Sequence, residues 1–433
     1  MYTEKIKEFI ESHKDEMTEL LGRLVAVRSV QGEAEEGYPF GRKPAEALEI
    51  MLEQCFSSGF NVENVENYVG TAEYGENPAL GILCHLDVVP EGDGWEADPY
   101  TMRIDAESGK LIGRGTIDDK GPAVAALYAL KAVKELGIPL KKGVRLLFGT
   151  NEENGSADLA YYRKKRDLPP MVFTPDGEYP VINAEKGMIR VYFSAEMKDD
   201  EEIAQINAGS VVNAVPGRCR VVYRSEDEEG ITVDYNGIPA HASTPAKGDN
   251  AITRFLSEYS GENELFIHLG ELFPHGELNG RSCGLGFSDD ISGEMTCVLS
   301  MLNTEEGAVR GAIDIRFPLD RKIGEIREII CGSLEGAGFT VDSAEGTDPH
   351  CTDESSEFVQ SLLRVYERLT GEKGRSIAIG GGTYVHEIEG GVAFGAEFPG
   401  VDYNMHGPEE FITVGELMLN ARMIAEAITE LCT

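Results

Sequence analysis

Short apolar runs alternate with helical patterns along the first part of the chain, and this alternation limits the possible folds more than any other feature. The segment 120–137, KGPAVAALYALKAVKELG, is a helical pattern with Pro122 in its first turn and Gly137 after its last. The apolar runs around it are short, as buried strands are. Such alternation predicts an α/β fold with a mixed, mostly parallel sheet covered by helices. The predicted strands are 78–89, 143–150 and 169–176, and further helices are predicted at 1–27 and 44–57.

From about residue 188 the pattern changes to strands in which apolar and polar residues partly alternate. Such strands are typical of an antiparallel sheet with one face in water, and interleaved helical patterns predict a separate α+β domain. Helix-rich sequence then returns at 354–369 and 414–431. Because 433 residues exceed what one hydrophobic core usually spans, we predict two domains, one inserted into the other. The outer domain comprises residues 1–187 and 349–433, and the inserted domain residues 188–348. The inserted strands are predicted at 188–197, 217–225, 230–237, 294–303 and 307–318, and its helices at 248–259 and 322–335.

The composition excludes several classes of partner. A net charge of −37, from 39 basic and 76 acidic residues, disfavours nucleic acid and anionic membranes, because both are bound through basic patches. The sequence shows no signal-peptide pattern at its start and no apolar run near 18 residues. The eight cysteines form no C-x-x-C pair, which favours free thiols over a zinc ribbon. We therefore predict a cytoplasmic protein without a membrane or nucleic-acid partner.

Acidic residues and histidines occur in five places, four of them at the ends of predicted strands. In open α/β sheets, ligands bind beyond the carboxyl ends of the strands, so these side chains are expected to converge. So many carboxylates would repel one another strongly without cations, and two divalent metal ions would neutralise them. Imidazoles and carboxylates without thiolate form a ligand set of the zinc type. The side chains concerned are His85, Asp87, Asp118, Asp119, Glu152, Glu153, Asp176 and His406.

The pair His85 and Asp87 has a direct mechanical interpretation. Alternate side chains of a strand share a face, so Asp87 can hold the far nitrogen of His85 and orient the ring toward a metal. Taken singly, a His-x-Asp is usually incidental, and an acidic pair after a strand is usually a solvated turn or a helix cap. The occurrence of five such motifs in this order favours the metal site.

Four segments, HLDVVPEGDGW, GRGTIDDKGP, NEENG and PDGEYP, resemble in order and spacing those of the PepV-type dipeptidases. These dipeptidases belong to the zinc metallopeptidase family that also holds aminoacylases, glutamate carboxypeptidases and desuccinylases. The resemblance runs nearly end to end, and implies a zinc-exopeptidase-like catalytic domain, formed by the outer segments, with the inserted domain as a lid. It also implies a set of five metal ligands for two Zn²⁺ ions, with Mn²⁺ or Co²⁺ as possible replacements. These ligands are His85, Asp118, Glu153, Asp176 and His406, with Asp118 bridging both ions.

The same resemblance implies a hydrolytic mechanism. Glu152 would be the general base that takes a proton from a metal-bridging water and later delivers it to the leaving amine. Asp87 would support catalysis by orienting His85. The peptide bond between Asp118 and Asp119 would be cis, as in the relatives.

Three residues of the inserted domain match lid motifs of the family. His241, in NGIPAHASTPAKGDNA, would donate a hydrogen bond to the developing oxyanion. Asn213, in VVNAVPG, would contact the substrate, and Arg316, in IDIRFP, would grip its terminal carboxylate. One departure concerns GGGTYVHE, in which His386 stands where relatives commonly carry an arginine. His386 could be a partly charged substitute for this arginine or a result of loop drift, so the exact peptide specificity stays open. The segment Gly380–Gly382 could still present backbone donors to the substrate.

We therefore expect an enzyme that hydrolyses dipeptides or short unblocked peptides. One alternative is an N-acyl amino acid deacylase or carboxypeptidase of the same mechanism. A second is a metal-dependent protein that binds peptides without hydrolysing them, although such a protein would need no base at Glu152. Boundaries near 188 and 348 give a lid of about 160 residues, which is larger than the lids of dimeric relatives. In those relatives the histidine that corresponds to His241 serves the neighbouring subunit, whereas a lid of this size can serve its own site, so the resemblance favours a monomer over a homodimer.

Overall fold

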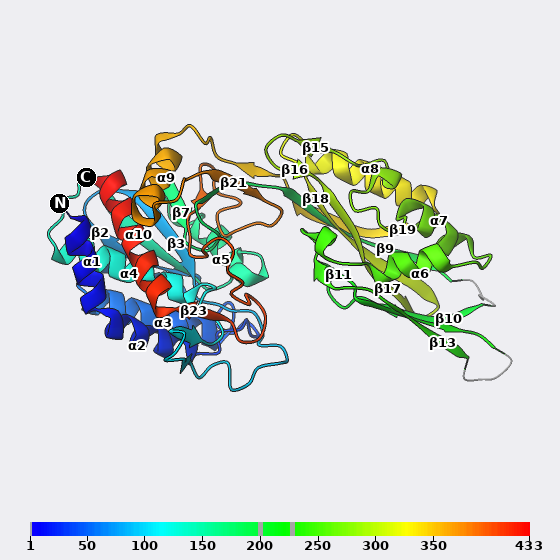
Figure 1. Ribbon diagram of the computed structural model, residues 1–433, viewed down its shortest axis with the longest axis horizontal. Helices are drawn as coiled ribbons and strands as arrows, with labels where there is room; N and C mark the ends of the chain where they lie inside the picture. Colours follow the sequence, from blue (N-terminus) through cyan, green and yellow to red (C-terminus); the bar gives the residue numbers. More distant parts are fainter. Residues whose placement is uncertain (1, 198–201, 226–229) are drawn as a thin grey trace. The chain divides into compact units, whose positions relative to one another are not determined.

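The computed structural model describes residues 2–197, 202–225 and 230–433, which divide into two compact units (Figure 1). Unit 1 consists of Met1–Asn183, Thr352–Ile377 and Thr383–Thr433. Unit 2 consists of Ala184–Cys351 together with the short segment Ala378–Gly382. Each unit has a hydrophobic core of its own.

The sheet of unit 1 is mixed and has parallel strands at its centre. Strands β6, β3, β7 and β22 lie side by side in this order, and each neighbouring pair is parallel. Antiparallel strands flank this centre, with β2 and β1 beyond β6 and β8 beyond β22. The predicted α/β class is thus confirmed. These seven of the sheet's nine strands are β1 (Asn61–Val65), β2 (Val69–Tyr74), β3 (Pro78–His85), β6 (Gly143–Gly149), β7 (Met171–Thr174), β8 (Val181–Glu185) and β22 (Val392–Ala393).

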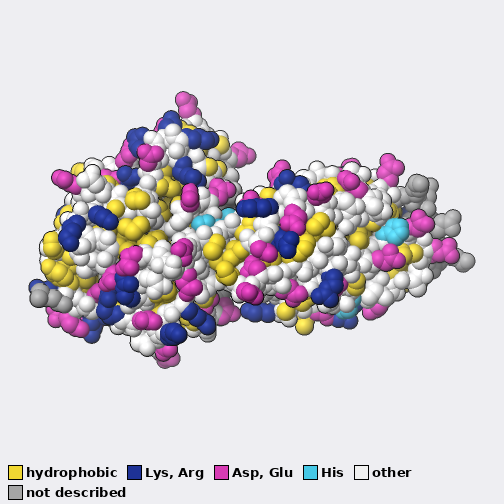
Figure 2. Space-filling model, turned by 90° about the horizontal axis from the view of Figure 1, so that it is seen from above, with side chains coloured by type: hydrophobic (Ala, Val, Ile, Leu, Met, Phe, Trp, Pro, Cys, Tyr) yellow, Lys and Arg dark blue, Asp and Glu magenta, His cyan; other side chains and the backbone are white. Residues whose placement is uncertain are grey.

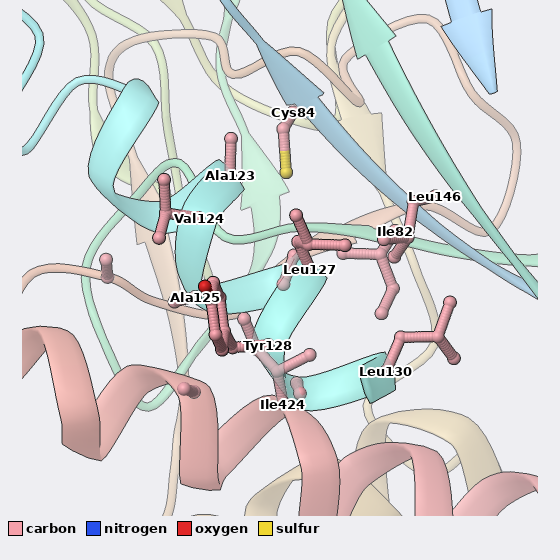
Figure 3. Packing of buried hydrophobic residues seen from close by; sticks show 14 of the residues in the cluster. Ile82, Cys84, Ala123, Val124, Ala125, Leu127, Tyr128, Leu130, Leu146 and Ile424 are labelled. Atoms are coloured by element: carbon pink, nitrogen blue, oxygen red, sulfur yellow. The ribbon is translucent and has the colours of Figure 1, made fainter. Parts of the chain in front are cut away.

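Helix α4 (Lys120–Glu135) is apolar on nearly all sides and is buried between the sheet and helix α10 (Val414–Cys432). Figure 3 shows Leu127 of α4 near Ile82 of β3, with Ile424 of α10 on the other side. Burying a large apolar side chain of this kind completely contributes about 1.5–3 kcal/mol to the free energy of unfolding. This packing fixes the start of α4 against the carboxyl ends of the strands. The remaining long helices of unit 1 are α3 (Arg42–Ser57) and α9 (Glu357–Thr370).

The predicted helix at 1–27 is two helices in the structure, α1 (Thr3–Ser12) and α2 (Lys14–Val25), and Met1 lies outside the described residues. The break is at His13, whose backbone N–H bonds to the carbonyl of Ile10 instead of continuing the helical ladder. The side chains of Ser12 and His13 both bond to the carbonyl of Phe9, at 2.7 and 2.8 Å. Such local side-chain bonds compete with helix continuation.

Unit 2 is built on a seven-stranded sheet in the order β13-β12-β10-β17-β18-β9-β19, in which all pairs are antiparallel. Helices α6 (Ala251–Glu258), α7 (Glu264–Leu272) and α8 (Ile323–Gly336) pack on it, so the predicted α+β insertion is confirmed. Strands β10 and β19 were not predicted from the sequence, and the residues of β19 are exposed or partly buried, so they carry little apolar pattern. The strands are β9 (Gly187–Glu196), β10 (Ile203–Ala208), β12 (Arg218–Tyr223), β13 (Ile231–Asn236), β17 (Thr296–Glu305), β18 (Ala308–Phe317) and β19 (Thr340–Thr347).

The surface carries the strong negative charge of the sequence. On the face drawn in Figure 2, acidic side chains are scattered among basic ones. No disulfide joins any of the eight cysteines, all of which lie among the described residues. Across residues 2–197, 202–225 and 230–433, no helix combines the length and the apolar character that crossing a membrane requires.

Candidate metal centre

The side chains that we predicted as metal ligands converge at the carboxyl ends of the central strands of unit 1. His85 is the last residue of β3, the short helix Glu152–Asn154 begins three residues after β6 ends, and Asp176 follows β7 by two residues. Parallel strands present these ends at one edge of the sheet. Asp118 comes from the segment before α4 and His406 from the loop after β22.

These residues form two groups that share Asp118. Its Oδ1 lies 2.9 Å from Nε2 of His85, which is also 3.6 Å from Oδ2 of Asp176. Its Oδ2 lies 2.8 Å from Nε2 of His406, which is also 3.4 Å from Oε2 of Glu153. Within each group the ligand atoms all lie within 4.8 Å of one another. Asp118 therefore offers one oxygen to each group, as a carboxylate between two cations would.

The donor atoms fit a pair of divalent cations. Nitrogen and oxygen ligands at about 2.0–2.1 Å from a tetrahedral ion lie roughly 3.3 Å apart, and the observed separations of 2.8–3.6 Å bracket this value. Among the residues that the structure describes, Oε1 of Glu153 is a buried atom without a hydrogen-bond partner. Buried polar atoms are rarely left so unless an ion or water completes them.

Proton affinities in the centre indicate the same deficit of positive charge. Burial raises the pKa of Glu152 well above its usual range, and the carboxylates of Asp176 and Glu153 raise it further. Burial also raises the pKa of Glu153 to about 7, with the Asp118 carboxylate adding to the shift. Partial burial opposes the charge of His406, but hydrogen bonds to Asp118 and Glu153 raise its pKa to about 11. The metal-free centre thus retains protons that divalent cations would displace.

Asp87 lies in the centre, but its hydrogen bonds differ from those expected of a His-x-Asp pair. Nδ1 of His85 lies 3.1 Å from the backbone carbonyl of Asp87 and 3.5 Å from its carboxylate. The Asp87 carboxylate instead accepts the backbone N–H groups of Glu152 and Glu153, at 3.1 and 3.2 Å. Because β3 ends at His85, the alternation of a strand no longer governs the next two residues. The carboxylate therefore holds the acidic turn, and the carbonyl fixes the imidazole.

Two further acids position this turn and the end of β3. Asp119 accepts the backbone N–H of His85 at 2.9 Å, and the peptide bond before Asp119 is cis. Asp158 is fully buried and accepts the N–H groups of residues 150–151, at 2.6 and 2.9 Å, and the hydroxyl of Tyr384 at 2.6 Å. Sequence reasoning missed Asp158, although an acid inside an apolar helical turn just after NEENG is a signal that could have found it.

The predicted lid residues Asn213 and His241 lie next to each other in unit 2. Strands β11 (Ala214–Val215) and β14 (Ala240–His241) pair, and the carbonyl of Asn213 accepts the N–H of the residue after His241 at 2.9 Å. The His241 ring is exposed, and its Nδ1 lies 2.7 Å from the hydroxyl of Ser243. Ser243 therefore fixes the orientation of this imidazole.

Arg316, in β18, is 4% exposed, and much of its hydrogen-bonding capacity is already used. Its Nε and Nη2 donate to the two oxygens of Asp314 at 2.6 and 3.0 Å, and its Nη1 donates to the carbonyl of Gly380 at 3.1 Å. A Cβ at Gly380 would lie 2.9 Å from that of Ser243, so only glycine fits this approach. Unit 2 thus brings Arg316 and the glycine segment to the Ser243 turn, while His386 belongs to unit 1.

Fold and centre together define a peptidase class. The chain matches the model of peptidase family M20/M25/M40 over residues 81–430, and it belongs to this family. It is 34% identical to the Beta-Ala-Xaa dipeptidase of Lactobacillus delbrueckii subsp. lactis, over 98% of each chain. Among solved structures it resembles human carnosine dipeptidase 1, with a TM-score of 0.67 and 18% identity over 99% of this chain and 98% of that one. It also resembles the di-peptidase Dug1p of Saccharomyces cerevisiae, with a TM-score of 0.65 and 14% identity over the same shares. At these identities the two structures show the fold, and the resemblance read from the motifs is confirmed at the level of the family.

Proposed function

We propose that the protein is a metal-dependent dipeptidase, which hydrolyses dipeptides or short unblocked peptides with two divalent ions. The observation that carries the proposal is that the two carboxylate oxygens of Asp118 serve different groups. One lies 2.9 Å from Nε2 of His85, and the other lies 2.8 Å from Nε2 of His406. His85, Asp118 and Asp176 would hold one ion. Asp118, Glu153 and His406 would hold the other. When bound, such ions would lower the pKa of a water molecule and polarise the scissile carbonyl.

Glu152 is the general base in this proposal. It belongs to neither ligand group, its backbone N–H is held by Asp87, and its pKa is raised well above the usual range by burial. A carboxylate of raised proton affinity can accept a proton from the attacking water and donate it to the leaving amine. Asp87 acts as a positioning residue for Glu152 and, through its carbonyl, for His85.

Unit 2 would supply the groups that recognise the substrate. His241 would donate to the developing oxyanion, its ring oriented by Ser243, and Asn213 beside it would contact the substrate. Arg316 uses three donors on Asp314 and Gly380. A guanidinium has five N–H donors in all, so it would grip a carboxylate with those that remain.

The metal and the assembly are finer points of the proposal. A set of imidazoles and carboxylates suits Zn²⁺, and also Mn²⁺ or Co²⁺. We expect a monomer in a cytoplasm whose reducing conditions keep the thiols free. Elemental analysis of the purified protein and light scattering after size exclusion test these two points.

A dipeptide-library assay with added Zn²⁺ or Mn²⁺ tests the activity, with N-acyl amino acids assayed in parallel and Glu152→Ala as the inactive control. Release of amino acids from unblocked dipeptides by the wild-type protein alone supports the proposal. Turnover restricted to N-acyl amino acids would replace it with a deacylase. Binding of dipeptides without any release would replace it with a peptide-binding protein.

A further inference from the structure

A buried ion pair in unit 1 connects the two segments that carry Asp118 and His406. Arg114 and Glu410 are 1% and 0% exposed, and Nη1 of Arg114 donates to Oε2 of Glu410 at 2.6 Å across 296 positions of sequence. Burying two charges is costly, so such a pair persists only where other hydrogen bonds complete it.

The second oxygen of Glu410 reaches the backbone that precedes α4. Its Oε1 accepts the N–H groups of Ile117 and Asp118, at 3.0 and 3.3 Å. These bonds fix the backbone from which the Asp118 carboxylate extends. The position of the acid shared by the two donor groups therefore depends on Glu410.

The other half of the pair reaches the loop of His406. Nη2 of Arg114 donates to the backbone carbonyl of His406 at 3.2 Å, and also lies 3.2 Å from the carbonyl of Glu91. His406 has a φ of +58°, in the left-handed region that residues other than glycine adopt only where the surroundings hold them. The bond from Arg114 is one such restraint.

The other donor group has a different support. His85 ends a central strand of the sheet, and its N–H is held by Asp119. His406 lies in a loop outside the regular strands, and its side chain is 52% exposed. Loss of the Arg114–Glu410 pair should therefore displace the His406 group more than the His85 group.

We propose that Arg114 and Glu410 form a positioning pair that sets the His406 group and so determines the affinity for one of the two metal ions. This inference rests on the proposed two-ion centre. Neither side chain would contact an ion or the substrate. The pair acts through the backbone of Asp118 and His406.

Titration of the metal-free full-length protein with Zn²⁺, followed calorimetrically, tests the pair. In Glu410→Gln we expect the affinity for one ion to fall by about 10- to 100-fold, the scale observed when groups that orient ligands are removed, and the other binding step to persist. The single variant leaves the charge of Arg114 buried and unpaired, so it could fold poorly. The double variant Arg114→Gln with Glu410→Gln removes both charges, and should show the same selective loss of affinity for one ion. Glu73→Gln is the control. Glu73 accepts a hydrogen bond of 2.5 Å from Arg145, and this pair belongs to neither donor group.

A second measurement assigns the affected ion. In a His406→Ala variant, binding of the ion held by the His406 group is already lost. Adding Glu410→Gln to this variant should therefore change the affinity for the remaining zinc ion little. Such a non-additive result is expected of coupled residues. If wild type and both Glu410 variants have equal zinc affinities, the positioning role is overturned and the proposed function is not. Equal weakening of both steps, or a full further loss in the His406→Ala background, would also overturn it. A wild-type protein that takes up no zinc would instead overturn the proposed function.

Discussion

Asp314 in unit 2 and Asp118 in unit 1 are buried carboxylates that are neutralised differently. In unit 2, Asp314 is fully buried, and both of its oxygens accept hydrogen bonds from the Arg316 guanidinium. In unit 1, the ion pairs that Asp118 makes with described residues are both to imidazoles, those of His85 and His406. The chain therefore supplies a permanent counter-charge to Asp314 and only titratable ones to Asp118.

This difference separates a structural acid from a functional one. A guanidinium is always protonated, so the Asp314–Arg316 pair is complete without any further group. The carboxylates around Asp118 instead retain protons, as the raised pKa of Glu153, about 7, indicates. Burial without a fixed counter-charge prepares a site for exchange between protons and metal ions.

The largest effect is expected from removing the acid that belongs to neither donor group. Glu152→Ala should leave the metal content intact and lower kcat for dipeptides by about 10²- to 10⁴-fold, since general-base catalysis supplies that much. Elemental analysis and steady-state kinetics on the same preparation check both parts. A variant that keeps its turnover would show that Glu152 is not the base.

Removing Arg316, the fixed counter-charge of Asp314, should lower stability as well as substrate binding. Arg316→Met leaves the buried Asp314 with only its longer contact to Arg190, at 3.7 Å, and should lower the free energy of unfolding by up to about 3–5 kcal/mol. Denaturant titration measures this loss. Arg310→Met is the matched control on the same strand, because Arg310 and Glu305 form an exposed pair at 3.6 Å, for which a change of about 0–1 kcal/mol is expected. Equal stability of the two variants would remove the contrast between the units.

Loading with metal should stabilise the protein through unit 1. At a free Zn²⁺ concentration about 100 times the Kd, one site adds about 2.7 kcal/mol to the free energy of unfolding. Thermal unfolding with and without Zn²⁺ measures the gain. Asp118→Asn should lose most of it, because both donor groups use Asp118. An Asp118→Asn variant that still gains the full amount would disprove the sharing of this carboxylate.

The smallest effect, when counted per pH unit, is a slope of stability with pH in the metal-free protein. Burial raises the pKa of Glu397 from 4.5 to about 8, and the carboxylates of Asp176 and Asp118 add to the shift. The folded state therefore binds more protons than the unfolded state between these values. The resulting stability is present below pH 4.5 and is lost as the pH rises through about 8.

Glu397→Gln should flatten this slope, by at most about 1.4 kcal/mol per pH unit for a single group. Chemical denaturation of both metal-free proteins at several pH values checks it. Identical slopes for the variant and the wild type would show that Glu397 already loses its proton at its usual pKa.

Much of the fold could be predicted because its elements carry local patterns. The largely apolar helix α4 and the short, mostly apolar strands β3 and β6 were identified from the sequence. The edge strand β19 was missed because its partly exposed residues lack such a pattern, and the first helix was predicted as continuous because hydrophobic periodicity does not register a local break at His13.

The sequence by itself determined which residue types end the central strands, and therefore that acids and imidazoles would gather at one edge of the sheet. Only the tertiary structure decided how they are held. The Asp87 carboxylate bonds to the turn of Glu152 and lies farther, at 3.5 Å, from Nδ1 of His85. Glu410 joins Arg114 across 296 positions, a contact that no local spacing encodes. Strand patterns are local because backbone alternation produces them, whereas hydrogen bonds of buried side chains depend on which distant segments the fold brings together.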